Sequence, residues 1–291
     1  MLDQILIQAL SGLSRGMVLF VVASGLTLVF GTMRIANFAH GSFYMLAAFI
    51  TYSVSSMVGQ STLGFVAALL IAPLAVAGFG AVIEAALLRH ISKRPHQYQL
   101  ILTYAVTLIV ADGIKAIWGR SYHTVDRPSG LNGAVFIFDM PFPSYNFVLI
   151  FAGLIIAVLL HLMLTRTRFG KTVRAAVMDG EMVGALGVNV PRLFTGVFAL
   201  GAGLAGLGGV LAAPVGSVSL GLDTSIIIES FAVIIIGGVG SVPGALIGAL
   251  LIGLLQSIGI LFAPKMAIAF IFVALCIVLV VRPQGLLGRA T

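Results

Sequence analysis

Long, uninterrupted runs of apolar residues divide the chain. They cover residues 5–31, 41–58, 63–88, 99–118, 146–164, 193–213, 226–237, 243–262 and 266–281. Most approach the roughly 20 apolar residues that a helix needs to cross a bilayer, and they lack the apolar–polar alternation typical of barrel strands. The pattern therefore predicts an all-α polytopic membrane protein with about eight to nine membrane segments, in a single transmembrane domain over residues 1–291.

One of these runs is short and broken. Residues 226–237 are too few to cross about 30 Å of hydrocarbon, and the glycine-rich stretch 237–244 that follows interrupts the helix. Broken helices in membrane proteins tend to line a transport pathway rather than face lipid. We therefore expect a partly crossing or re-entrant helix, with Gly237, Gly238, Gly240 and Ser241 as candidate pathway or gate residues.

A second polar interruption separates the first two runs, in the sequence MRIANFAHGSF at residues 33–43. Guanidinium, amide, imidazole and hydroxyl groups crowd this short join, which is more than a turn requires. Irregular polar backbone between membrane spans is typical of a pathway or a gate. Arg34, Asn37, His40 and Gly41 form the second group of candidate pathway residues.

The few charged residues predict an orientation. Only 9% of residues are charged, and Lys and Arg outnumber Asp and Glu by 16 to 9. If the N-terminus lies outside, the basic clusters fall in the cytoplasmic loops, as the positive-inside rule requires. Ser129 is then outside, and Thr172 and the C-terminus are inside. The basic excess is thus a topology signal, and we expect no nucleic-acid partner. The first run lacks a preceding basic region, so we expect it to remain as a span rather than be removed as a signal.

Five charged residues fall within or beside the apolar runs: Arg15, Glu84, Asp112, Lys115 and Glu229. Such charges are functional candidates by default, but pairing is the simpler interpretation for most of them. Asp112 and Lys115 are three residues apart, as in a local helix pair. Glu229 is expected at the start of the short helix, where a carboxylate is favourable. Arg15 has no partner nearby in the sequence.

No catalytic or nucleotide-binding motif is complete. The sequence TRTRFGKT at residues 165–172 ends like a P-loop, but it has threonine where the loop needs its first glycine. GAGLAG at residues 201–206 matches a dinucleotide motif but lies in an apolar run, where close helix packing is the better interpretation. The single Cys276 is expected to be a buried, inert thiol. We expect a protein that is not an enzyme, with no cofactor and no bound metal.

Four stretches carry a family resemblance. They are GLTLVFGTMRIANFAHGSFYMLAAF at 25–49, GVNVPRLFTGVFALGAGLAGLGGVLAAP at 187–214, IIIGGVGSVPGALIGALLIGLLQS at 234–257 and RPQGLLG at 282–288. In these stretches the chain resembles the LivH-type permeases of bacterial branched-chain amino acid ABC importers.

The resemblance implies a multi-pass protein of the bacterial inner membrane with a periplasmic N-terminus. It also implies several partners: a second homologous permease in a heterodimer, two cytoplasmic ATPase subunits that carry the P-loops, and a periplasmic substrate-binding protein. Substrates in the family extend from branched-chain amino acids to other amino acids, amides and urea. An importer permease for a sugar and a stand-alone ion-coupled carrier are the alternatives. The carrier would need a coupling carboxylate, for which Asp112 and Glu229 are the candidates.

The longest inner segment, residues 165–192, is where an ATPase would act. Residues 178–188 predict a short amphipathic helix with one apolar stripe, formed by Met178, Met182, Ala185 and Leu186. One interpretation is a coupling helix docked in a groove of the ATPase, and the other is a helix that lies on the membrane surface. The candidate coupling residues are Met178, Glu181, Met182, Gly184, Ala185, Leu186 and Gly187.

Overall fold

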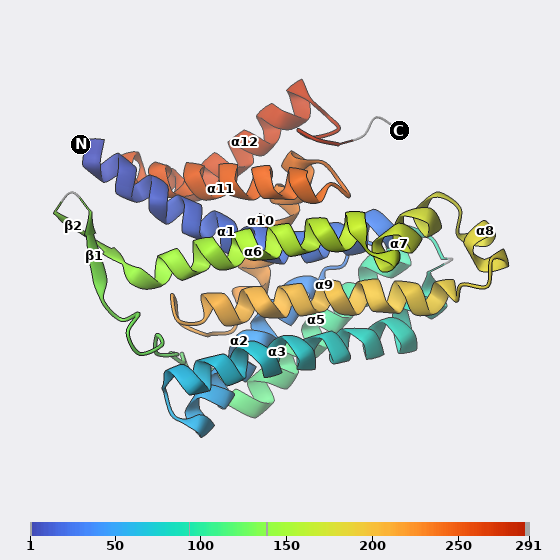
Figure 1. Cartoon of the computed structure of the whole chain (residues 1–291), viewed down its shortest axis with the longest axis horizontal. Helices are drawn as coiled ribbons and strands as arrows, with labels where there is room; N and C mark the ends of the chain where they lie inside the picture. The colour runs from blue at the N-terminus through green and yellow to red at the C-terminus, as the bar shows by residue number, and fades with distance from the viewer. Residues whose placement is uncertain (1, 93, 138, 289–291) are drawn as a thin grey trace.

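A computed structural model describes residues 2–92, 94–137 and 139–288 (Figure 1). Each of the nine predicted apolar runs coincides with a helix. The helices are α1 (Leu2–Met33), α2 (Ala39–Val58), α3 (Thr62–Ile83), the π-helical turn η1 (Glu84–Leu88), α4 (Arg89–Ile91), α5 (His96–Trp118), α6 (Ser144–Arg166), α7 (Arg168–Met178), α8 (Gly180–Ala185), α9 (Val190–Ala212), α10 (Leu222–Gly237), α11 (Val242–Phe262), the 3-10 turn η2 (Pro264–Met266) and α12 (Ala267–Val281).

The helices confirm the predicted class. Within the described ranges, seven helices are long and apolar enough to cross a membrane, and α10 and α12 are shorter, at 16 and 15 residues. Two short antiparallel strands, β1 (Ala134–Ile137) and β2 (Met140–Pro143), form a hairpin before α6. The bundle is elongated, with the N-terminus and this hairpin at one end and α8 at the other (Figure 1).

Helix α1 forms the axis of the bundle, between α11 on one side and α9 on another. Glycines on α1 bring the backbones into contact, as is typical of membrane helices. A Cβ atom on Gly12 would lie 2.8 Å from the carbonyl oxygen of Gly253 on α11. One on Gly25 would lie 2.5 Å from the carbonyl oxygen of Gly201 on α9. Because Gly201 opens the GAGLAG stretch, this contact supports a packing role for that motif.

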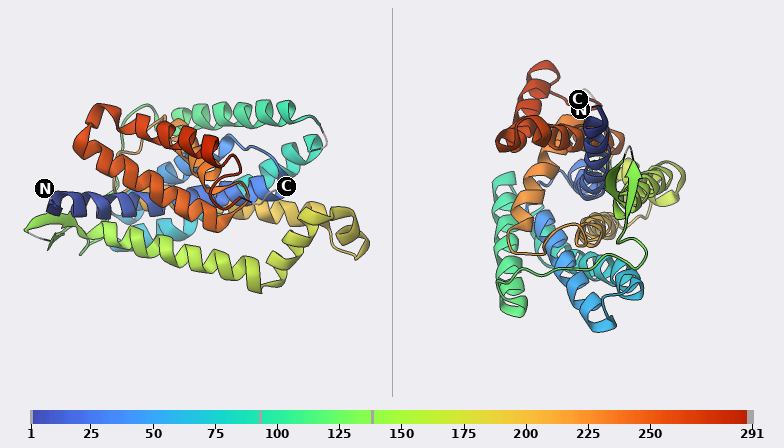
Figure 2. Two further views of the ribbon diagram at one scale, coloured as in Figure 1. Left: turned by 90° about the horizontal axis from the view of Figure 1, so that it is seen from above. Right: turned by 90° about the vertical axis from the view of Figure 1, so that its left-hand side faces the viewer.

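Helix α10 connects two parts of the bundle. Its first turn contacts α2, where the backbone of Gly41 meets the carbonyl of Asp223, and its last residue, Gly237, contacts Gly244 on α11. In the end-on view of Figure 2 it runs from α2 toward α11 and α12. The prediction that Glu229 begins this helix is wrong, because α10 begins at Leu222. Asp223 in the first turn is the N-terminal carboxylate of α10. Because this turn is polar, it precedes the apolar run at residue 226 from which the start of the helix was predicted.

Candidate functional site

The join between α1 and α2 folds back along α1. Arg34 has a left-handed backbone conformation (φ 55°), and its amide donates to the carbonyl of Phe30 at the end of α1. The chain then returns, so that Nε2 of His40 lies 2.9 Å from the carbonyl oxygen of Val22. Val22 precedes the end of α1 at Met33 by roughly 16 Å along the axis at 1.5 Å per residue. Helix α2 therefore begins beside the interior of α1.

Three side chains of this join are fully buried and incompletely hydrogen-bonded. Asn37, His40 and Ser42 have no exposed surface, and their Nδ2, Nδ1 and Oγ atoms lack a partner within the described residues. The neighbouring helices α1 and α10 add Oγ1 of Thr27 and Oγ of Ser230, which are also buried without a partner. An unsatisfied buried group costs roughly 1–3 kcal/mol, so this concentration of unpaired groups in one region needs an explanation.

The second candidate segment is the turn between α10 and α11. Since α11 begins at Val242, the break covers residues 238–241 and is shorter than the stretch 237–244 expected from the sequence. The amides of Leu286 and Leu287 donate to the carbonyls of Ile236 and Gly237 at 2.8 and 3.0 Å. The RPQGLLG stretch thus closes this turn from outside.

Glycine is required on both sides of this contact. Gly238 and Gly285 both have positive φ angles, 102° and 80°. A Cβ atom on Gly285 would lie 2.5 Å from the Cα atom of Gly238. Two of the stretches that carried the family resemblance therefore pack directly against each other, and Gly237 and Gly238 are buried beneath the C-terminal segment.

Arg34, Gly240 and Ser241 line one cavity of about 1650 Å³. It lies where α1 ends and α11 begins, and α5, α6 and α7 also contribute to its wall. Its charged or imidazole lining residues are Arg34, His96, His161 and Arg174. The structure thus brings one residue of the first predicted gate segment together with two of the second. The other candidates, Asn37, His40, Gly41, Gly237 and Gly238, are packed away from this cavity.

The predicted coupling helix is interrupted. Helix α7 ends at Met178, and the extended backbone of Asp179 starts α8, with its carboxylate accepting a hydrogen bond of 2.9 Å from the amide of Met182. A single helix over residues 178–188 is therefore wrong, because aspartate is a strong N-cap residue. Helix α8 is then ended by Gly187, whose φ is 87°.

The apolar side chains of the predicted stripe around α8 are exposed in this chain. Met178, Met182 and Leu186 are 86, 58 and 77% exposed, and a Cβ atom on Gly184 would meet no atom within 4 Å. Glu181, Ala185 and Gly187 are exposed as well. Since α8 forms the tip of the molecule (Figure 1), this apolar surface is not covered by the described part of the chain.

The intramembrane charges are paired. Asp112 and Lys115 form the predicted local pair at 3.7 Å. Arg15 finds its partner far away in the sequence, with Nη2 lying 2.7 Å from Oε1 of Glu229 on α10. Cys276 is exposed, so its predicted burial is wrong. Burial does not follow from a place in an apolar run, because such a run can face lipid as well as protein. Cys276 lies on the part of α12 that is not covered by its neighbours α10 and α11.

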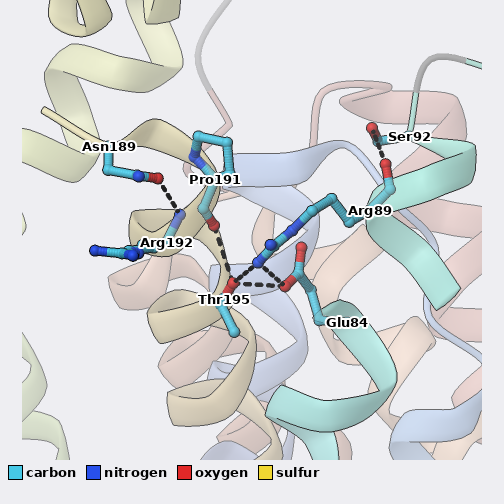
Figure 3. Close-up of polar contacts among 7 residues, drawn as sticks. All are labelled: Glu84, Arg89, Ser92, Asn189, Pro191, Arg192 and Thr195. Carbon is cyan, nitrogen blue, oxygen red and sulfur yellow. Dashed lines mark hydrogen bonds and ion pairs between the residues drawn. The ribbon is translucent and has the colours of Figure 1, made fainter. Parts of the chain in front are cut away.

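A polar cluster near the α8 end of the bundle joins α9 to the π-helical turn (Figure 3). Oε2 of Glu84, whose side chain is 2% exposed, lies 3.3 Å from Nη2 of Arg89 and 2.6 Å from Oγ1 of Thr195. Nη2 of Arg89 also donates to Oγ1 of Thr195 at 2.5 Å. Nothing in the sequence pointed to Thr195, and the five-residue spacing of Glu84 and Arg89 was the available signal for the ion pair.

Known proteins match the chain over nearly its whole length. BraD of Pseudomonas aeruginosa, a high-affinity branched-chain amino acid transport system permease protein, is 28% identical, covering 97% of this chain and 95% of that protein. LivH of Escherichia coli K12, with the same description, is 27% identical over the same shares. The fructose import permease protein FrcC of Rhizobium meliloti is 36% identical, over 33% of this chain and 28% of that protein.

The family described as “Branched-chain amino acid transport system / permease component” matches residues 8–281. This range runs from the first helix to the last and includes both candidate gate segments and α8. The chain therefore belongs to this family of transport permeases.

Proposed function

We propose that this chain is the permease subunit of an ABC importer for branched-chain or closely related amino acids. The similarity to BraD and LivH along 97% of the chain is the observation that carries this proposal. The remaining subunits would be a second homologous permease, two cytoplasmic ATPases and a periplasmic binding protein.

The two alternatives have weaker support. The similarity to the fructose permease covers only 33% of the chain, which is too little to carry its substrate across. A stand-alone carrier would use a carboxylate free to bind and release a coupling ion. Both candidates are engaged in this structure, Asp112 with Lys115 and Glu229 with Arg15.

Reconstitution with these partners tests the function. Proteoliposomes that hold the complete complex are supplied with ATP and with leucine, isoleucine, valine, alanine, urea or fructose. We expect uptake of the branched amino acids that depends on both ATP and the binding protein. Uptake of fructose in their place would support the sugar alternative, and uptake without the ATPases would support the carrier.

The exposed apolar surface of α8 is the proposed docking point of the ATPase. Gly184→Glu and Leu186→Asp place charge in a desolvated groove, which a docked interface tolerates poorly. Both variants should insert normally yet lose the ATPase on purification or lose uptake at unchanged hydrolysis. Tyr122→Asp, at a position that is 77% exposed near the other end of the bundle, is the matched control. Normal co-purification and uptake by both α8 variants would reject this assignment and favour a helix on the membrane surface.

The unpaired polar atoms of Asn37, His40 and Ser42 support a gate at the α1–α2 join. Groups that are unsatisfied in one state gain partners when water or substrate reaches them in another. In a Cys276→Ala background, Ser42→Cys should resist a small polar thiol reagent at rest and react during turnover. Equal reactivity in the two conditions would remove Ser42 from the gate.

Ser129 and Thr172 test the proposed orientation. They lie in the segments near opposite ends of the bundle, and the basic loops predict Ser129 outside and Thr172 inside. In the same Cys276→Ala background, an impermeant thiol reagent added to spheroplasts should label Ser129→Cys and spare Thr172→Cys. The opposite result would invert the orientation.

A further inference from the structure

We propose that Glu84, Arg89 and Thr195 form a joint, a contact that opens and closes during transport. While closed, it transmits movement of α8 to α5 and to the candidate gate residues. None of the three is among the residues that line the cavity, so they are positioning residues. The proposal rests on the proposed function, because it needs an ATPase that moves α8.

The π-helical turn creates the ionic half of the joint. In an α-helix, side chains five residues apart are separated by about 140° at 3.6 residues per turn and point in different directions. Here the amide of Arg89 donates to the carbonyl of Glu84, which is the hydrogen bond of a π-turn. This wider turn brings the two side chains to one side, where they contact each other and α9. Turns of this kind are frequent at functional sites.

The hydroxyl of Thr195 gives the joint two arrangements. Oγ1 lies 2.6 Å from Oε2 of Glu84 and 2.9 Å from the carbonyl oxygen of Pro191, one turn earlier in α9. A hydroxyl has one proton to donate, so it can bond to only one of these oxygens at a time. When α9 moves away from Glu84, the hydroxyl keeps a partner in its own helix. Opening therefore leaves the Thr195 hydroxyl proton with an acceptor, unlike the separation of an ordinary buried pair.

One side of the joint leads to α8. Helix α9 begins at Val190, and the side chain of Asn189 caps it by accepting from the amide of Arg192 at 3.0 Å. Thr195 is in the second turn of this helix, and only residues 186–189 separate α9 from α8. A displacement of α8 therefore acts directly on the beginning of α9, close to the hydroxyl that contacts Glu84.

The other side leads to the gate. Nε2 of Gln99, in the first turn of α5, donates to the carbonyls of Ser92 and Arg94 at 3.1 and 3.3 Å. These residues follow α4, which Arg89 begins. One turn further along α5, Oγ1 of Thr103 lies 3.1 Å from the carbonyl oxygen of Leu100 in its own helix and 3.4 Å from that of Ala36, the neighbour of buried Asn37. Hydrogen bonds thus connect the π-turn to α5, and the Thr103 hydroxyl, which α5 and the α1–α2 join share, is the contact between those two segments.

A static brace is the simpler interpretation of the same contacts. The two interpretations, a static brace and a joint, predict different consequences when the Thr195 hydroxyl is removed. Removing a brace loosens the helix ends whether or not nucleotide is present. Removing the joint leaves a folded complex in which α8 still moves and α5 no longer follows.

Spin-label distances in the complete complex distinguish the two. The complex is placed in nanodiscs with Cys276→Ala and cysteine-free partners. Exposed Ala175→Cys, on α7 one turn before α8 and outside the proposed docking residues, reports on the movement of α8, and Ile101→Cys, at a position that is 67% exposed, reports on α5. Each is paired with a reference label at Ser129→Cys, and distances are measured with and without a non-hydrolysable ATP analogue.

In the wild-type sequence we expect nucleotide to change both distances. In Thr195→Val, the α8 distance should still change while the α5 distance stays fixed. Uptake per ATP should fall about tenfold, as expected when an equilibrium loses one charge-assisted hydrogen bond. Thr195→Ser, which keeps the hydroxyl, should behave as wild type. Thr172→Val is the matched control, because the Thr172 hydroxyl bonds only to the Arg168 carbonyl in its own helix.

Three results would overturn the joint. An α5 distance that still responds in Thr195→Val would show that transmission does not use the hydroxyl. Failure of the complex to assemble with both Thr195→Val and the milder Glu84→Gln would identify a brace. No movement of α8 in the wild-type complex would overturn the proposed function itself, and the joint with it.

Discussion

Helices α1 and α5 are both long apolar membrane helices, yet the bundle holds them in different ways. In their most apolar stretches, 78% of α1 is buried by the rest of the chain and 22% of α5. Glycines bring α1 into backbone contact with α9 and α11. Helix α5 is attached through polar side chains such as Gln99, Thr103 and Trp118. Close packing therefore holds α1 along most of its length, whereas α5 is held by the narrow buried stripe Val106, Val110 and Ile114 and by a few hydrogen bonds.

The largest expected effect comes from a single methyl group on α1. Gly12→Ala would place its Cβ 2.8 Å from the Gly253 carbonyl oxygen, and overpacking of this kind costs about 1–3 kcal/mol. Gly113→Ala on α5 is the matched control, because its Cβ meets no atom within 4 Å and alanine favours the helix by up to about 1 kcal/mol. We expect the thermal midpoint in detergent to fall for Gly12→Ala and to hold or rise for Gly113→Ala. Equal shifts would contradict the contrast between the two helices.

The ion pairs sharpen the same contrast. Arg15 joins α1 to α10 through Glu229 at 2.7 Å, whereas Asp112 and Lys115 pair within α5 at 3.7 Å. In double-mutant cycles with Arg15→Met and Glu229→Gln, we expect a coupling energy of about 1–2 kcal/mol, because contacting groups on separate helices lose each other's support. The cycle with Asp112→Asn and Lys115→Met should give about 0.3–0.5 kcal/mol, typical of a local helix pair. Similar values in SDS unfolding for both cycles would argue against a distinct role for the α1–α10 pair.

The smallest expected effect is on one end of α5. Nε1 of Trp118 donates to Oγ of Ser53 on α2 at 2.7 Å. Trp118→Phe keeps the aromatic surface and removes this donor, at a cost of about 1 kcal/mol. Hydrogen exchange should become faster in the last turns of α5 and remain unchanged in α1. Unchanged exchange in α5 would mean that this hydrogen bond does not hold its end.

The features of the fold that depend on local sequence patterns could be predicted. Each continuous apolar run marked a helix, and the three-residue spacing of Asp112 and Lys115 predicted their pair. The partner of Arg15 could not be predicted, because Glu229 is 214 residues away and nothing local links them. The apolar run 63–88 contains one charged residue, Glu84, where the π-turn begins, and its five-residue spacing from Arg89 does not by itself distinguish a π-turn from an α-helix.

The candidate sites divide in the same way. The apolar stripe that contains Met182 and Leu186 was visible in the spacing of residues 178–188, whereas the break at Asp179 depends on its capping side chain. The glycines of the α10–α11 turn were recognised as irregular, but the C-terminal residues that pack on Gly238 lie more than 40 residues later in the chain. A Cβ atom on Gly238 would overlap the amide nitrogen of Gly288, and that contact exists only after folding.

The contact between residues 282–288 and the α10–α11 turn has a consequence for biogenesis. The carbonyls of Ile236 and Gly237 receive their hydrogen bonds from Leu286 and Leu287, which the ribosome makes after α11 and α12. Until then the turn stays uncapped in the inserted chain, because domains fold as synthesis proceeds from the N-terminus. Chains interrupted before residue 286 would thus display an open glycine turn with two uncapped carbonyl groups.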